Sequence, residues 1–264
     1  MSEWGSPGLR VQSPKGTWRG LLLWGVGLGL SGSLLGAVSP AELQKWLADV
    51  DATRNAFPEV VIRARATQVL DGKEQGSSEF EIYAKGRDRA VIVFRDPRNS
   101  GRKVLTVKER MWLIVPGTTN PVPITPNQRL LGGASFGDVA KLRFAEDFTA
   151  AERETPQTVA GRECRVLDLR ARDARAPYPQ VVLWVDSLDH LARKVLFFLP
   201  SGKEAKEALF TKFSKVAGKT VISEMEIRDL LGRESRTVTR LEYLEYRPAR
   251  LDDAIFTPEG ARGL

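Results

Sequence analysis

The chain has 264 residues, of which 42% are hydrophobic and 28% are charged, and its formal net charge is +7. This length provides for one large domain or two small ones, and the hydrophobic content excludes an intrinsically disordered chain. The basic residues alternate with acidic and apolar ones. The excess of positive charge therefore indicates solvated strand faces, and no nucleic-acid partner is expected.

The first 37 residues have the pattern of a secretory signal peptide. Three basic residues precede the apolar run 20–37, and small residues follow it, with Ala37 or Ala41 as the cleavage site. A retained membrane anchor is the alternative, because the run nearly reaches the length of a bilayer span. Its glycines and serines favour cleavage. Cys164 is the only cysteine, so no intrachain disulfide can form, which suits a periplasmic protein.

A helix is predicted at residues 39–55. Ser39 and Glu42 form a capping box, and Pro40 occupies the first helical position. Apolar residues follow at helical spacing, which gives the helix one stripe that faces a buried surface. The stripe consists of Leu43, Trp46, Leu47 and Val50.

After Pro58 the apolar period changes from helical to alternating, which indicates strands. Short turns separate the strands, so neighbours are expected to be antiparallel. About eleven strands are predicted, at residues 60–70, 77–86, 89–97, 102–109, 110–116, 163–172, 178–186, 191–200, 206–214, 219–229 and 235–247.

Only two further helices are predicted, a short one near 134–142 and one in the C-terminal "TPEGARGL". These are too few to cover such a sheet in two layers. The expected fold is mainly β (α+β), a single domain in which a curled antiparallel sheet holds the helices on its concave face. Such a shape leaves an apolar cavity between sheet and helices, which is a typical ligand site.

No motif predicts catalysis, a metal site or a cofactor. His190, the only histidine, lies in "VDSLDHLARKV" between two strands, where a hairpin turn is the expected setting. Cys164 opens a strand and is expected to be a buried structural thiol. The glycines of "LLGGASFGD" do not follow the spacing of a phosphate-binding loop. The protein is therefore not expected to be an enzyme.

Several short motifs occur in an order that is hard to obtain by chance. They are Pro97 and Gly101 in a turn, Trp112, Leu113 and Pro116 at a strand end, Ile124, Arg129, "GASFGD", "VDSLDHLARKVLFF" and "LDDAIFTPEG". In these motifs, over residues 40–260, the chain resembles the outer membrane lipoprotein-sorting family, the LolA-like proteins of Gram-negative periplasms. The resemblance implies an open, half-closed antiparallel barrel covered by short helices. It does not place the family's ligand-gating arginine.

The resemblance also implies that residues 38–264 shelter acyl chains of a lipid or lipoprotein and carry them across the periplasm. An inner-membrane transporter is a candidate partner, and a monomer is expected. Residues 111–136, with the helix after them, are the candidate lid, because the stretch is apolar and its only charge is Arg129. The candidate cavity residues are Leu43, Trp46, Leu47, Trp112, Ile114, Leu130, Leu131, Phe136, Val139 and Leu142.

Two other functions remain open. A periplasmic sensor that resembles anti-sigma-factor regulators could use the same fold, although such proteins normally carry a second domain and the chain shows no domain boundary. A hydrolase would have to use His190 or Cys164.

Overall fold

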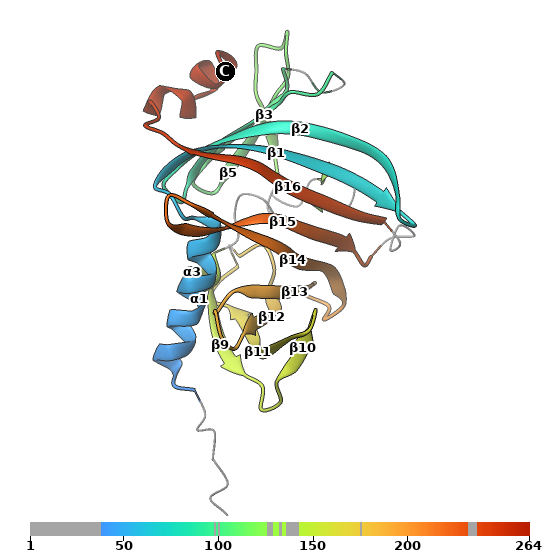
Figure 1. The fold of residues 1–264 in the computed structure, drawn as a ribbon. Helices are drawn as coiled ribbons and strands as arrows, with labels where there is room; N and C mark the ends of the chain where they lie inside the picture. The colour runs from blue at the N-terminus through green and yellow to red at the C-terminus, as the bar shows by residue number, and fades with distance from the viewer. Residues whose placement is uncertain are drawn as a thin grey trace, which may run out of the picture. The chain divides into compact units, whose positions relative to one another are not determined.

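A computed structural model describes residues 38–97, 99, 101–125, 134–135, 143–174, 176–231 and 237–264, and the backbone of 129–131. Residues Ala37–Leu264 form one compact unit. Within it, fourteen strands form one antiparallel sheet in the order β10-β11-β12-β13-β14-β15-β16-β1-β2-β3-β4-β5-β6, with β9 paired to β11. The sheet is strongly curved and its ends do not meet (Figure 1). This open half-barrel confirms the predicted fold class.

The strands follow the chain closely. The large sheet contains β1 (Glu59–Leu70), β2 (Lys73–Lys85), β3 (Arg89–Phe94), β4 (Lys103–Val107), β5 (Arg110–Ile114), β6 (Val122–Ile124), β9 (Phe148–Glu152), β10 (Gln157–Val159), β11 (Arg162–Ala171), β12 (Gln180–Asp186), β13 (Ala192–Phe198), β14 (Glu204–Val216), β15 (Lys219–Asp229) and β16 (Thr237–Pro248). A separate pair consists of β7 (Arg129–Leu131) and β8 (Ala134–Ser135).

The predicted number of strands was too low. All eleven predicted strands are present, and the structure adds β6 to β10, which have two to five residues each. Four of the added strands have only two or three residues, which give too little alternation to recognise. β6 lies at the edge of the sheet. Pro123 has no backbone N–H to donate, which an edge strand tolerates better than an interior one.

Helix α1 (Pro40–Arg54) begins as predicted. The Ser39 hydroxyl accepts a hydrogen bond from the Glu42 backbone N–H, and the Glu42 carboxylate accepts one from the backbone N–H of Ser39. Leu43, Leu47 and Val50 are buried on one side of the helix. The helix packs on β15, β9 and the short helix α3 (Phe144–Asp147), and so covers the inner face of the sheet.

The predicted C-terminal helix is present, but it lies on the outer face of the sheet and not on the predicted concave face. The short helices η1 (Asp253–Phe256) and α4 (Pro258–Arg262) pack on β3 and β4 from the outer face, and Thr257 caps α4. The helix predicted near 134–142 is not confirmed at its start, since Ala134–Ser135 are strand β8, and residues 136–142 lie outside the described residues.

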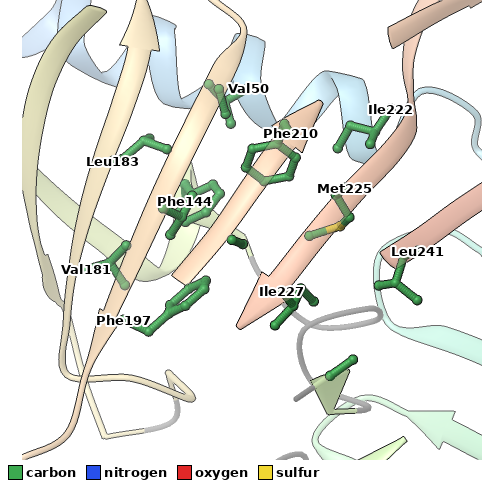
Figure 2. Packing of buried hydrophobic residues seen from close by; sticks show 14 of the residues in the cluster. Val50, Phe144, Val181, Leu183, Phe197, Phe210, Ile222, Met225, Ile227 and Leu241 are labelled. Atoms are coloured by element: carbon green, nitrogen blue, oxygen red, sulfur yellow. The ribbon is translucent and has the colours of Figure 1, made fainter. Parts of the chain in front are cut away.

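The two faces of the sheet bury separate cores. On the inner face, side chains of α1 and α3 meet those of β12 to β15, among them Val50, Phe144, Phe197 and Phe210 (Figure 2). On the outer face, β3, β4 and β5 bury apolar residues against Phe256 and Ala261 of the C-terminal segment. Gly101 in the β3–β4 turn adopts φ +79°, and a Cβ there would lie 2.8 Å from Cγ of Pro116, so the two motif residues pack on each other.

Candidate functional site

A cavity of about 360 Å³ opens on the inner face of the sheet. Its floor comes from β1, β2, β3 and β4, and its walls from β15, β16 and the C-terminal end of α1. The apolar lining includes Phe57, Val60, Ile62, Ile82 and Ile222. The volume lies within the roughly 300–1,000 Å³ that is usual for ligand sites.

One row of small side chains makes room for the cavity. Strand register places the members of the row side by side across four strands, and all of them line the cavity; they are Val60, Ala84, Ala90 and Thr106. The next row is larger and β-branched, namely Ile62, Ile82, Ile92 and Val104. The first row has smaller side chains than the second, so the floor of the cavity is deeper at the first row. The strands pair in regular register through both rows.

Two tyrosines of β16 form one wall. Tyr243 and Tyr246 differ by three residues, so regular alternation would point them to opposite faces. The register with β1 shifts between Arg63 and Ala64, which pair with Glu245 and Tyr243. The bulge at Leu244 brings both tyrosine side chains to the cavity.

The wall formed by these tyrosines is uncharged. The two rings lie 6.0 Å apart, and the Tyr246 hydroxyl donates a 2.7 Å hydrogen bond to the carbonyl of Ile222. Burial raises the pKa of Tyr246 far above its ordinary value, so the phenol stays protonated at every physiological pH.

The mouth of the cavity carries charged residues from four segments. Five are basic and three acidic, which gives 5 − 3 = +2; they are Arg54, Arg87, Arg89, Lys108 and Arg143, with Asp88, Glu109 and Asp147. Arg143 Nη1 lies 3.2 Å from the Glu146 carboxylate, and its Nη2 lies 3.5 Å from that of Asp147. Burial raises the pKa of Asp147. The positive charge of Arg143 lowers it, but by less than burial raises it.

Asp51, near the C-terminal end of α1, joins this helix to α3. Its carboxylate accepts hydrogen bonds from the backbone N–H groups of Phe144, at 3.0 Å, and Ala145, at 2.9 Å. It thereby caps α3 across a tertiary contact. Burial raises the pKa of Asp51 in spite of these two bonds.

The described side chains among the ten candidate cavity residues do not line this cavity. Leu43 and Leu47 are buried in the inner core, and Trp46 lies at its margin. The Trp46 ring lies 5.1 Å from the His190 ring and 5.3 Å from the Arg165 guanidinium.

Trp112 and Ile114 lie on the opposite face from the one predicted. They belong to the outer core with the C-terminal segment, whereas Met111 and Leu113 face the inner core. Leu130 and Leu131 belong to β7, of which the backbone alone is described. Phe136, Val139 and Leu142 lie outside the described residues, so the lid stays a prediction.

His190 and Cys164 have the structural settings that were predicted. His190 adopts φ +55° in the β12–β13 turn, and its Nδ1 lies 3.5 Å from the Asp49 carboxylate. Cys164 is fully buried, and burial raises the pKa of its thiol. Within the described ranges no cluster of His, Cys, Asp or Glu could hold a metal ion. None of the helices in those ranges is long and apolar enough to cross a membrane.

A protein-family model, described as that of an uncharacterized protein, matches residues 86–260. The chain belongs to this family. No curated protein sequence matches the chain.

Solved structures share the fold along nearly their whole length. A LolA superfamily protein from Nitrosomonas europaea is 23% identical with a TM-score of 0.73, and the match covers 84% of this chain and 98% of that one. A DUF1329 family protein from Desulfovibrio piger is 18% identical with a TM-score of 0.71, covering 83% and 98%. An outer membrane lipoprotein-sorting protein domain from Vibrio parahaemolyticus is 14% identical with a TM-score of 0.70, covering 83% and 97%. The fold is therefore LolA-like, as the motifs predicted.

Proposed function

We propose that the protein is a periplasmic carrier that shelters one acyl chain of a lipid or lipoprotein in the cavity on its inner face. The observation that supports this most is the row of Ala84, Ala90 and Thr106, which leaves a hollow open on the inner face of the sheet. A fold shared with a lipoprotein-sorting domain agrees with this role. The role is one of binding and transport, without catalysis.

The energetics of an acyl chain require such a shelter. Each buried methylene group gains roughly 0.8 kcal/mol, so a chain of about sixteen carbons gains on the order of 12 kcal/mol when it leaves water. A shallow groove would bury too little of the chain to supply this free energy. The cavity's apolar floor and neutral tyrosine wall supply a suitable surface.

The periplasmic location follows from the predicted signal peptide at residues 1–37. A carrier of this kind would collect its cargo at the inner membrane, where a transporter is the proposed partner, and release it toward the outer membrane.

Lipid binding can be tested on protein purified from the periplasm of the expressing cells. We expect mass spectrometry to find co-purified lipid and a fluorescent fatty acid to bind the delipidated protein. Ala90→Leu should abolish this binding, since the larger side chain fills the hollow. The matched control is Ala151→Leu on the exposed surface of β9, which should bind as the wild type does. Protein that is always empty and takes up no fatty acid would exclude the carrier function.

A further inference from the structure

Strands β15 and β16 are paired with each other over only part of their length. At one end this pairing stops at Glu224 and Glu242. Beyond that point, residues 219–222 of β15 stay paired with β14, and residues 243–248 of β16 stay paired with β1 around the bulge. The two strands therefore separate toward this end, as Figure 1 shows. We call the region between residues 219–222 and 243–248 the side split.

Side chains on both sides of the side split line the cavity. Ile222 comes from β15, and Tyr243 and Tyr246 come from β16. Phe57, in the segment between α1 and β1, lines the cavity as well. In a continuously paired sheet, a row of backbone hydrogen bonds closes the way between two neighbouring strands. Across the side split the described residues form no strand pairing, so side chains close the cavity on this side.

Side-chain contacts replace the missing backbone pairing at the side split. The Tyr246 hydroxyl donates its 2.7 Å hydrogen bond to the Ile222 carbonyl, and so joins β16 to β15. Lys219 Nζ donates a 2.6 Å hydrogen bond to the Ala56 carbonyl and lies 5.2 Å from the centre of the Phe57 ring, and so joins β15 to the segment after α1. Each contact can break by rotation of one side chain, whereas a strand ladder opens only when several backbone bonds break together.

We propose that the acyl chain enters and leaves the cavity through the side split, and that Tyr246 is the gate. This inference rests on the proposed carrier function. The gate opens when the Tyr246 hydroxyl releases the Ile222 carbonyl and the ring turns away from β15. The methyl end of the chain then passes between Phe57 and Ile222 toward the row that contains Ala84. Because the chain end enters first, it stays among apolar side chains and the polar head group remains at the surface.

The rates of fatty acid uptake and release test the gate. Stopped-flow fluorescence follows cis-parinaric acid, a fluorescent fatty acid, as it binds to and leaves the delipidated protein. Tyr246→Phe keeps the ring and removes the hydrogen bond across the side split, so both rate constants should rise about fivefold, as expected for the loss of one ordinary hydrogen bond. The matched control is Tyr83→Phe on the outer face, where the hydroxyl bonds to Glu81, and both rates should stay as in the wild type. A rise in the release rate alone would mean that Tyr246 is only a ligand contact, and would overturn the gate.

A bulky label beside the side split tests the route without any change at Tyr246. Leu244, at the bulge of β16, is 38% exposed, and Leu70, at the far end of β1, is 37% exposed. Leu244→Cys and Leu70→Cys can each be coupled to a maleimide that carries polyethylene glycol, because the native Cys164 is fully buried and does not react. The label at residue 244 should slow uptake and release several-fold. The label at residue 70 should leave both rates unchanged.

The outcomes separate the route from the carrier function. If labelled Leu244→Cys takes up the fatty acid as fast as the unlabelled variant does, the chain enters elsewhere, and the portal is overturned while the carrier function stands. If the wild type takes up no fatty acid, the carrier function itself fails. The labelled pair keeps the route testable even if Tyr246→Phe is too unstable to purify.

Discussion

The inner face of the sheet is filled on one side and hollow on the other. Over β12 to β15, the space below α1 is occupied by large side chains, including Phe144, Phe197 and Phe210 (Figure 2). Over β1 to β4, the corresponding space borders Ala84, Ala90 and Thr106 and stays open. Both regions belong to one continuous antiparallel sheet.

This difference shows that the size of inward side chains decides where the fold is a core and where it is a site. Antiparallel pairing runs through both regions, with register shifts in β12 to β15, and both regions present apolar residues to the inner face. Aromatic residues from α3, β13 and β14 fill the first region. The second borders the end of α1 with Arg54, the α3 region with Arg143 and Asp147, and the two tyrosines of β16.

The largest effect is expected where the filled region loses an aromatic ring. Phe197 is 2% exposed, and its ring lies 4.5 Å from that of Tyr178. Phe197→Ala should lower the free energy of unfolding by about 3–5 kcal/mol, through lost burial and the cavity left behind. Urea unfolding measures this loss.

The neighbouring residue on the same strand is the control. Phe198 is only partly buried on the outer face, so Phe198→Ala should cost less. Equal costs for the two variants would contradict the view that the inner face at β13 is tightly packed.

The sequence predicted most strands and helices, but it did not predict which face of the sheet some side chains occupy. Alternation and short turns predicted eleven of the strands, and the capping box at Ser39 and Glu42 predicted α1. The face occupied by Trp112 and Ile114 was not predictable, because "MWLIV" is apolar throughout and has no alternation from which to assign a face.

The position of the cavity could not be predicted from the alternation of apolar residues, because it depends on strand register, a bulge and tertiary packing. Ala84, Ala90 and Thr106 are ordinary strand residues until strand register places them in one row. Tyr243 and Tyr246 share a face only because of the bulge at Leu244. Arg54 and Lys108 reach the mouth through tertiary packing, whereas Leu43, Trp46 and Leu47 of the α1 stripe lie in the inner core or at its margin.

An identical substitution in the two regions should have different consequences. Ala208 is 1% exposed in the filled core, and Ala208→Leu should destabilise the protein by about 1–3 kcal/mol through overpacking. Ala90→Leu extends into the cavity, and it should change stability by less than about 0.5 kcal/mol or raise it, as cavity-filling substitutions often do. Urea unfolding of both variants in delipidated protein provides the comparison. A large loss in Ala90→Leu would mean that the hollow does not exist in solution.

The smallest effect concerns Asp51, whose carboxylate joins the end of α1 to the start of α3 at the boundary between the two regions. Asp51→Ala should cost about 1 kcal/mol, as for the loss of other helix caps, and Asp51→Asn should cost less because one acceptor oxygen remains. The pKa of Asp51 is raised in the folded state, so the folded protein takes up a proton at a higher pH than the unfolded chain. Stability from this group therefore increases as the pH falls from neutral through the raised pKa, and is lost as the pH rises. The wild type should gain stability relative to Asp51→Asn over that range in urea titrations at pH 7, 6 and 5. A relative loss would mean that the two backbone bonds outweigh burial and that the carboxylate is the favoured form at this boundary.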